Sequence, residues 1–195
     1  MRRKLTWLVV LSAAIVVAAL YNSRNVLATS ANGFKATTIA TGTFSGFEVF
    51  NHAVLPNPAG DGDNDRDDKS VWLSIQKTKG LSDLYVQSNV WQPVSATGVV
   101  SSTGWHTHPG HSLIIVTAGT ITEYDSDCIP YAYTFVPGQP APTLVDPGHG
   151  HVHIVRNEGS VPASTIAVQL VPFDPNKANR RIDVSPAPET CSNIN

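Results

Sequence analysis

The sequence has little charge: Lys, Arg, Asp and Glu make up 14% of its 195 residues, and the formal net charge is -2. No basic stripe follows residue 4, and nucleic-acid binding usually requires a basic field. We therefore expect no nucleic-acid partner. Sustained helical periodicity is also missing after the N-terminal apolar run, as is any internal repeat. Without helical periodicity, the sequence favours an all-β domain.

The N-terminus has the layout of an export signal. Basic residues at positions 2–4 precede an apolar run over Leu5–Leu20, after which the chain becomes polar. The small side chains of Val26 and Ala28 suit cleavage after Ala28, which would make residues 1–28 a signal peptide. An uncleaved membrane anchor is the second interpretation, because the run is shorter than the roughly 20 residues of a spanning helix. Either interpretation predicts an extracytoplasmic location, with membrane contact only through an uncleaved segment.

Only two cysteines are present, Cys128 and Cys191, and both lie in the part expected to be exported. Oxidation is permitted there, so a disulfide between them is one expectation. Closing so long a loop would stabilise the fold by on the order of 4 kcal/mol. Two unpaired thiols remain the alternative, because the sequence does not give the distance between them.

An acidic stretch over Asp61–Asp68 places aspartates at alternating positions. It is similar to the first half of a calcium loop, but Trp72 stands where the closing glutamate should be. We expect a solvated loop, with calcium binding as the alternative.

Elsewhere the apolar residues come in short or alternating runs that end at glycine or proline. This pattern predicts an antiparallel β-sandwich or β-barrel. The residues after Pro186 resemble an extended tail. The strand candidates are Ala36–Ala40, Phe47–Ala53, Val71–Gln76, Asp83–Trp91, Gly98–Ser101, Ser112–Ala118, Thr120–Tyr124 and Ser164–Val171.

Six of the seven histidines lie in two patches, Gly104–Ser112 and Pro147–His153. Residues i and i+2 of a strand share a face, so His106 and His108 can direct two imidazoles at one point. Neutral imidazole binds divalent Fe, Mn, Zn, Cu or Ni. We predict one such metal ion, with a third ligand from the second patch.

The two patches resemble the two motifs of the cupin superfamily. The first runs from Gly104 through His106 and His108 to Gly119, and the second carries a histidine and an asparagine four residues apart, His153 and Asn157. The resemblance implies a double-stranded β-helix, or cupin jelly-roll barrel, within a single domain over 29–195 with an extended C-terminal tail. It also implies a mononuclear metal held by His106, His108 and His153.

The sequence departs from the family pattern at Ser112, where the family usually has a metal-binding glutamate. A serine hydroxyl is a poor ligand for these metals, so a three-histidine site is implied. His111 has the wrong strand parity to replace the carboxylate. His149 and His151 share parity with His153, and His151 is the reserve ligand.

Several residues could complete a cavity around such a metal. The candidates for its walls are Trp91, Trp105, Tyr85, Phe135 and the polar Gln169. Glu123 and Asp127 are candidate acids or bases if they face the barrel mouth.

The first functional hypothesis is a small-molecule oxygenase of the non-haem iron, dioxygenase-like type. The alternative is a non-catalytic module that binds a metal or small ligand. Metal-free sugar epimerisation, which cupin folds also perform, ranks last because it needs no such cluster. A small-molecule ligand is expected in each case, and a homodimer is left open.

Overall fold

The computed structural model describes residues 30–56, 69–176, 180–185 and 187–194. These residues form an all-β fold, as predicted, whose one helical element is a short 3-10 turn. The predicted export segment and the Asp61–Asp68 loop lie outside the described residues. Within those residues, no helix has the length and apolarity needed to cross a membrane.

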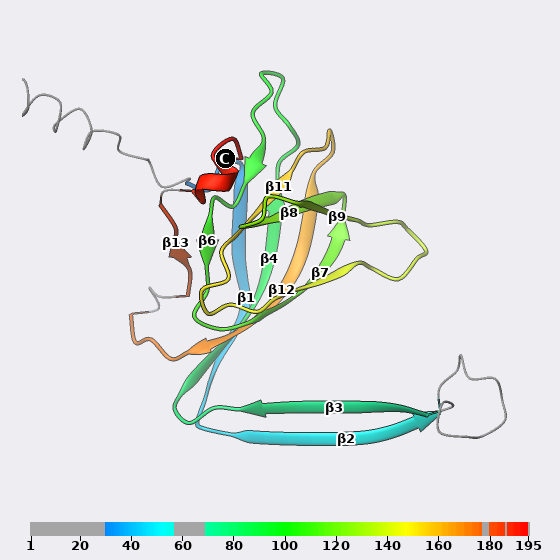
Figure 1. Cartoon of the computed structure of the whole chain (residues 1–195), viewed down its shortest axis with the longest axis vertical. Coiled ribbons are helices and arrows are strands. Elements are labelled where there is room, and N and C mark those ends of the chain that lie inside the picture. The colour runs from blue at the N-terminus through cyan, green and yellow to red at the C-terminus, as the bar shows by residue number, and fades with distance from the viewer. Residues whose placement is uncertain (1–29, 57–68, 177–179, 186, 195) are drawn as a thin grey trace, which may run out of the picture.

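Two facing sheets make up the barrel (Figure 1). The five-stranded sheet has the order β1-β4-β12-β7-β10, with β1 at Phe34–Phe44, β4 at Ser82–Trp91, β12 at Ala163–Pro172, β7 at Ser112–Ala118 and β10 at Thr143–Asp146. The second sheet has the order β13-β6-β11-β8-β9, with β13 at Ile182–Asp183, β6 at His106–Thr107, β11 at His153–Asn157, β8 at Thr120–Asp125 and β9 at Pro130–Thr134. The short β5, Ser101–Ser102, pairs with β11.

The order in which the chain visits the two sheets defines the fold. From β4 the chain crosses to β5 and β6, returns to β7, crosses to β8 and β9, returns to β10, crosses to β11 and ends in β12. All pairings between these strands are antiparallel. This alternation between two sheets is that of a jelly roll, or double-stranded β-helix.

Alternation of side chains places the core between the sheets. Along β12, residues with odd numbers from Ala163 to Val171 are buried, and the intervening ones are half-buried. The inward residues of the other strands join them, as the period of two predicts. The main cluster consists of Trp91, Val116, Ile121, Leu144, Val155 and Ala163.

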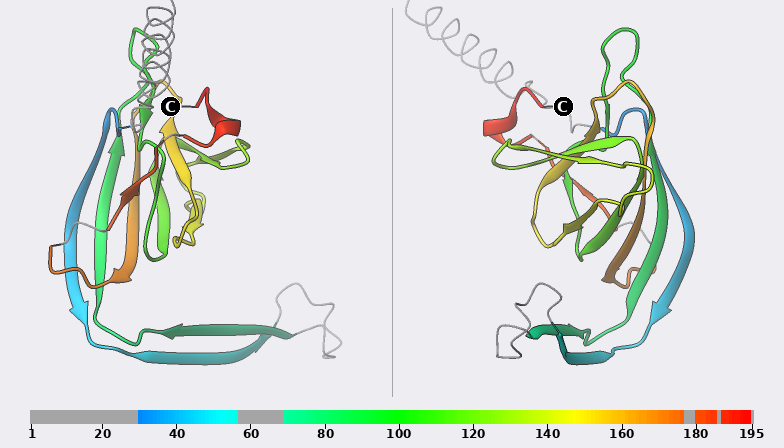
Figure 2. Two further views of the ribbon diagram at one scale, coloured as in Figure 1. Left: turned by 60° about the vertical axis from the view of Figure 1, so that its left-hand side comes forward. Right: turned by 90° about the vertical axis from the view of Figure 1, so that its right-hand side faces the viewer.

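A two-stranded arm extends from the barrel. Its strands are β2, Glu48–Pro56, and β3, Lys69–Lys77, which pair only with each other. The arm begins where β1 ends, returns to the barrel at the start of β4, and runs sideways beneath the barrel (Figures 1 and 2). The runs Phe47–Ala53 and Val71–Gln76 therefore form strands as predicted, but outside the barrel.

The strand expected at Gly98–Ser101 is wrong except at its end. Hydrogen bonds from Ser95 N to Val99 O and from Gly98 N to Ser95 O fold this segment into a turn. Its apolar residues therefore do not reach a sheet, and only Ser101 and Ser102 pair, with β11.

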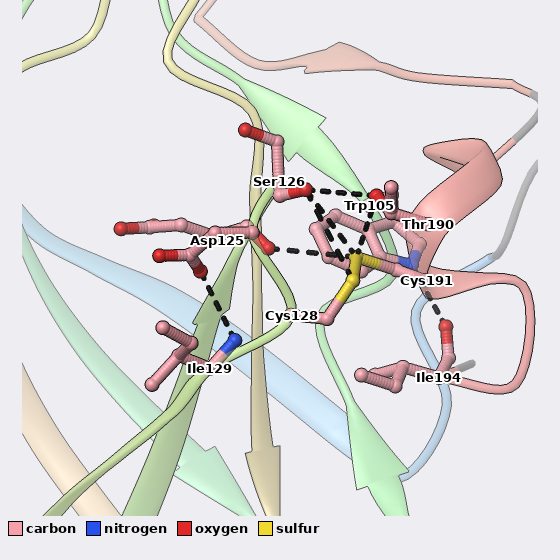
Figure 3. The surroundings of a disulfide bond; sticks show 9 residues. Trp105, Asp125, Ser126, Cys128, Ile129, Thr190, Cys191 and Ile194 are labelled. Atoms are coloured by element: carbon pink, nitrogen blue, oxygen red, sulfur yellow. Dashed lines mark hydrogen bonds between the residues drawn. A yellow bond between two sulfur atoms is a disulfide. The ribbon is translucent and has the colours of Figure 1, made fainter.

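The C-terminal residues do not form an extended tail. After β13 the chain enters a 3-10 turn over Glu189–Cys191, and both Cys191 and Ile194 are buried. The Cys128–Cys191 disulfide attaches this segment to the turn after β8 (Figure 3). The Trp105 indole nitrogen also donates a hydrogen bond to the Ile194 carbonyl at 2.8 Å. These contacts bury the tail against the barrel. The mostly polar sequence of the tail gave no sign of this packing.

Candidate metal centre

Three histidines from the two patches converge inside the barrel. His106 on β6 lies directly opposite His153 at the start of β11, and their ring centres are 4.5 Å apart. His108 follows β6, with its ring 4.8 Å from that of His106 and 5.9 Å from that of His153. One ring nitrogen of each histidine lies within 4.8 Å of the other two. The i, i+2 spacing thus directs both imidazoles of the first patch to one point, as predicted.

Close backbone packing joins the loops that carry these histidines. A side-chain carbon at Gly110 would lie 2.0 Å from the Leu170 carbonyl oxygen, and one at Gly148 would lie 2.1 Å from the Gly110 oxygen. Only glycine fits such approaches, and Gly148 also has a positive φ of 66°. The His149 amide then donates to the His108 carbonyl at 2.7 Å. The proline-glycine steps of both patches therefore hold the two loops together.

Backbone carbonyls fix the ring orientation of the first two histidines. The Nδ1 atom of His106 lies 2.8 Å from the Gly104 oxygen, and that of His108 lies 2.8 Å from the Arg180 oxygen. A carbonyl can only accept, so each contact requires the proton on Nδ1. This tautomer leaves the Nε2 lone pair of both rings available to a metal.

The side-chain amide of Gln169 also lies 2.8 Å from His108 Nδ1, through the atom assigned as nitrogen. Nδ1 cannot donate to the Arg180 carbonyl and accept from an amide N–H at once. The amide oxygen and nitrogen are exchangeable assignments. We favour the orientation with the oxygen toward the ring, because it keeps the 2.8 Å contact of Nδ1 with the Arg180 carbonyl. This exchange gives up the longer, 3.3 Å hydrogen bond from the Gln169 amide to the same carbonyl.

A carboxylate orients the third histidine. Glu123 on β8 contacts His153 Nδ1 through Oε1 at 2.8 Å, and both residues are buried. Carboxylate-imidazole pairs of this kind support metal-ligating histidines in many proteins. Among the described residues, His153 Nε2 has no hydrogen-bond partner. A buried ring nitrogen without a partner is the state expected of a metal ligand without its ion.

Burial keeps the first two histidines neutral. It lowers the pKa of His106 well below its usual range, and the electrostatic influence of the neighbouring His153 and Arg181 lowers this pKa further. Burial also lowers the pKa of His108, partly offset by the Arg180 carbonyl and by Asp146. Neutral imidazole is the form that binds metal, so these ligands are ready at neutral pH.

Ser112 lies at the inner face of β7 and lines the same cavity, but it is not alone there. Its hydroxyl donates to Asp146 Oδ2 at 3.4 Å, and Asp146 is fully buried on β10. The same oxygen lies 3.7 Å from His108 Nε2. A carboxylate is therefore present near the position where the family places its glutamate, although it comes from another strand.

Beside the histidines lies a cavity of about 100 Å³. Of the predicted wall residues, Trp91 and Gln169 line it. Tyr85 and Trp105 are buried elsewhere: the guanidinium of Arg180 lies over the Tyr85 ring, and Trp105 packs near the disulfide. Phe135 packs against the main core cluster. The remaining lining combines aliphatic side chains with polar ones, and it includes the arginines Arg180 and Arg181.

The other histidines lie apart from the triad. His111 faces a separate hollow between the arm and the barrel, in keeping with its opposite parity. His149 is exposed with a positive φ of 49°. The shared parity expected for His149, His151 and His153 is wrong, because β11 begins only at His153. Asp127 is exposed and accepts a hydrogen bond from the Ile129 amide in a turn, so it is no acid or base for this cavity.

A second group of metal-binding residue types combines Asp125, His151 and His153. His151 Nε2 is 3.0 Å from an Asp125 oxygen, and its Nδ1 is 3.3 Å from Asp146. Both ring nitrogens of His151 thus already face carboxylates. Since His153 has one free nitrogen, it can serve one group only, and the triad with His106 and His108 is the more buried of the two.

Sequence reasoning named Glu123 as a candidate acid or base but missed its contact with His153, and it missed Asp146 and Arg180. The role of Glu123 depends on the pairing of β8 with β11, which brings Val155 opposite Glu123 and the carboxylate diagonally beside His153. The Asp146 and Arg180 contacts likewise depend on elements distant in the chain. Asp146 directly precedes the second patch, and this position was the one signal in the sequence that an acidic side chain lies near the histidines.

No protein-family model matches the chain, and no curated protein matches it. Solved structures do. A cupin superfamily protein from Desulfitobacterium hafniense has 13% identity and a TM-score of 0.36, covering 46% of this chain and 68% of its own. A polyketide cyclase from Streptomyces resistomycificus has 15% identity and a TM-score of 0.40, covering 57% and 68%. An oxalate oxidase has 18% identity and a TM-score of 0.36, covering 52% and 46%.

TM-scores this low say nothing about the site. The cupin-like assignment therefore depends on the strand order and the histidines of this chain. The strand order is that of a jelly roll, and the residues of both histidine motifs meet inside it. Fold and site together define a cupin-like domain.

Proposed function

We propose that this protein is an exported, cupin-like metalloprotein that binds one divalent transition metal ion through His106, His108 and His153. The observation that carries the proposal is the common orientation of the three rings. Each Nδ1 faces an acceptor, and each Nε2 is left for a shared ligand. Metal-ligating histidines usually donate their other ring N–H to a carbonyl or carboxylate, as these three rings can.

The charges around the triad support a dication. Two buried carboxyl groups flank it, Glu123 beside His153 and Asp146 beside His108. The lowered pKa values of His106 and His108 mean that these rings supply no positive charge at neutral pH. A buried charge needs a partner, and a divalent ion between the rings would supply one for both carboxylates.

The donor set fits Fe, Mn, Zn, Cu or Ni, and three protein ligands leave coordination positions for a small molecule. When bound, such an ion supplies Lewis-acid or redox chemistry at those positions. The protein's own residues orient the ligands and keep water out. The carbonyls of Gly104 and Arg180 fix two rings and Glu123 fixes the third, while aliphatic side chains form part of the cavity wall beside polar ones.

We propose a small-molecule oxygenase of the non-haem iron type as the activity. The three-histidine donor set and the cavity beside it support this activity. The Cys128–Cys191 disulfide supports an oxidising, extracytoplasmic location. A non-catalytic metal or ligand module is the competing function, because it would need the same three ligands.

Metal analysis of the purified protein tests the site. The double variant His106→Ala/His108→Ala should lose the metal found in the parent. The matched variant His111→Ala/His149→Ala, from the same two patches but outside the triad, should keep it. Stoichiometric metal in the first variant would refute the assignment.

Oxygen uptake separates the two functions. The protein is loaded with Fe(II) without oxygen, then exposed to oxygen with a broad panel of small organic molecules. Uptake that depends on one compound and disappears in the His106→Ala/His108→Ala variant supports the oxygenase. Full metal occupancy without uptake across the panel supports the binding module.

A further inference from the structure

The arm formed by β2 and β3 has one face that is the more apolar, and the described chain leaves it exposed. Cross-strand pairs Phe50 with Ile75, and Val54 with Val71, on the same face of the ribbon, and Leu73 lies between them. The exposed fractions are 65% for Phe50, 64% for Ile75 and 53% for Leu73. The opposite face mixes the apolar Val49 and Trp72 with the polar Asn51, Ser74 and Gln76. Isolated two-stranded ribbons are marginally stable in water, and exposed apolar patches of this kind mark interaction sites.

A second apolar surface lies on the outer face of the five-stranded sheet. Leu113 and Ile115 point outward from β7, and Val145 points outward from β10 beside Leu113. Their exposed fractions range from 44% to 62%. The half-buried Ile166 and Val168 of β12 pair with Ile115 and Leu113 and continue the surface, which we call the outer band.

We infer that the arm docks, through its apolar face, on the outer band of a second copy of this chain. Both surfaces belong to one chain, yet the arm leaves the barrel at the end of β1, returns at the start of β4, and runs away beneath it (Figures 1 and 2). The arm therefore does not cover its own outer band. In a two-fold dimer each arm covers the partner's band, and both apolar surfaces leave water.

The area favours this reciprocal arrangement over a contact between two arms. Nine residues per strand at about 3.3 Å each, and two strands about 4.8 Å apart, give each arm face roughly 300 Å². Two arms packed on each other would bury roughly 600 Å² in total, below the roughly 1,200 Å² of a stable specific interface. Two arms, each on a partner's band, would bury about twice as much and reach that limit.

Charge argues for a protein surface as the occupant rather than an anionic membrane. Segments 49–54 and 71–76 of the arm carry no Asp, Glu, Lys or Arg. The ion pair between Lys77 and Glu48 lies on the same face, but at the arm's base, where the ribbon joins the barrel. Binding to anionic lipid draws on clustered basic residues, which these segments lack. The outer band is equally uncharged, so the two surfaces match.

Light scattering coupled to size-exclusion chromatography tests the inference on the purified protein. The parent should have twice the mass of one chain. The variant Leu73→Glu/Ile75→Glu should raise the dissociation constant of the dimer at least 100-fold and give a monomer at micromolar concentrations. The matched variant Ser74→Glu/Gln76→Glu adds the same charges to the opposite face of the same strand and should remain dimeric. A monomeric parent, or a dimeric Leu73→Glu/Ile75→Glu variant, would overturn the inference.

The arrangement is tested by a change on the other surface. Leu113→Glu, in the outer band, should weaken the dimer as much as the arm variant does. If it leaves the dimer unchanged while the arm variant dissociates it, the arms contact each other and the inference fails. Circular dichroism and metal content, which report the barrel rather than the arm, should match the parent in every variant.

Thiol cross-linking gives an independent measurement. The described residues contain no free cysteine, so introduced cysteines would be the only thiols among them. Ile75→Cys and Leu113→Cys proteins are prepared separately, mixed, and treated with a short thiol-specific cross-linker. A covalent dimer that forms in the mixture but in neither protein alone supports the arm on the partner's band. Equal cross-linking of Ile75→Cys alone would contradict it.

Discussion

The carboxylate of Glu123 lies 2.8 Å from Nδ1 of His153, with both side chains buried between the sheets. The pair links β8 to β11 and sets the direction of the free ring nitrogen. In the proposed three-histidine site, this carboxylate would hold a ligand ring in place through Nδ1 rather than bind the metal itself.

Glu123→Gln should keep the fold and weaken metal binding. The amide has nearly the same shape, so packing is retained, but it is neutral and a weaker acceptor for the imidazole N–H. Loss of such a supporting carboxylate typically costs about 10- to 100-fold in metal affinity. Competition with a chromophoric chelator measures the change for Zn(II).

Asp127→Asn is the matched control, because Asp127 is the other acidic candidate from the same region and is exposed in a turn. It should bind Zn(II) like the parent. Equal affinity in Glu123→Gln and the parent would show that Glu123 does not act on the metal site.

Ser112→Glu tests the departure from the family pattern. The new carboxylate would enter the cavity near Asp146, whose oxygen lies 3.4 Å from the Ser112 hydroxyl. Two buried carboxylates at this distance repel each other, so the metal-free protein should lose about 1–3 kcal/mol of unfolding free energy. Metal should restore more stability to this variant than to the parent, because the carboxylate adds a fourth ligand.

Urea unfolding with and without Zn(II) measures both effects, and Ser112→Gln separates charge from size. The glutamine variant should show the steric cost without the larger response to metal. An equal response of the two variants would contradict a ligand role for the carboxylate.

Replacing both cysteines by alanine should destabilise the protein. The disulfide joins residues 63 positions apart. The chain-entropy model gives about 4 kcal/mol for such a loop, and removal of native disulfides from small secreted domains costs about 2–5 kcal/mol. The urea midpoint should fall accordingly. A parent treated with reductant and alkylated while unfolded should match the variant, and an unchanged midpoint would contradict the prediction.

Alternation along the chain sufficed to predict much of the barrel. The run Ser112–Ala118 forms a strand with the predicted bounds, and Thr120–Tyr124 differs by one residue. A strand that is buried on one face alternates apolar and polar residues, and this alternation is visible in the local sequence. Strands such as β9 and β10 escaped because they are short and lie among prolines. The placement of Phe47–Ala53 in the arm could not be inferred either, since a strand's partner is a tertiary property.

For the site, spacing alone indicated that His106 and His108 act together, because two residues on one strand need no tertiary information. The position of His153 followed from the resemblance to the family motif. The Arg180 carbonyl reaches His108 Nδ1 because the C-terminal segment folds back on the barrel, and Glu123 reaches His153 Nδ1 because of strand register. The spacing of residues in the sequence predicts neither contact. The parity argument for His151 failed because it assumed a strand where the chain forms a loop.

The lowered pKa values of His106 and His108 predict how the stability of the metal-free protein depends on pH. In the unfolded chain these side chains titrate near their usual pKa of about 6.5. In the folded protein they take up protons only at lower pH. Between the two pKa values the unfolded chain therefore binds more protons, and the free energy of unfolding rises with pH.

The free energy of unfolding should therefore carry no penalty from these histidines above about pH 6.5. On acidification it should fall by up to about 1.4 kcal/mol per pH unit for each of the two histidines. Urea midpoints between about pH 5 and pH 7.5, measured with a chelator present, give this slope. His106→Gln should reduce it by the share of one histidine, because glutamine does not titrate. An unchanged slope in that variant would mean that His106 is not held neutral by its burial. Saturating Zn(II) should raise stability most above pH 6.5, since protons compete with the metal for the same nitrogens.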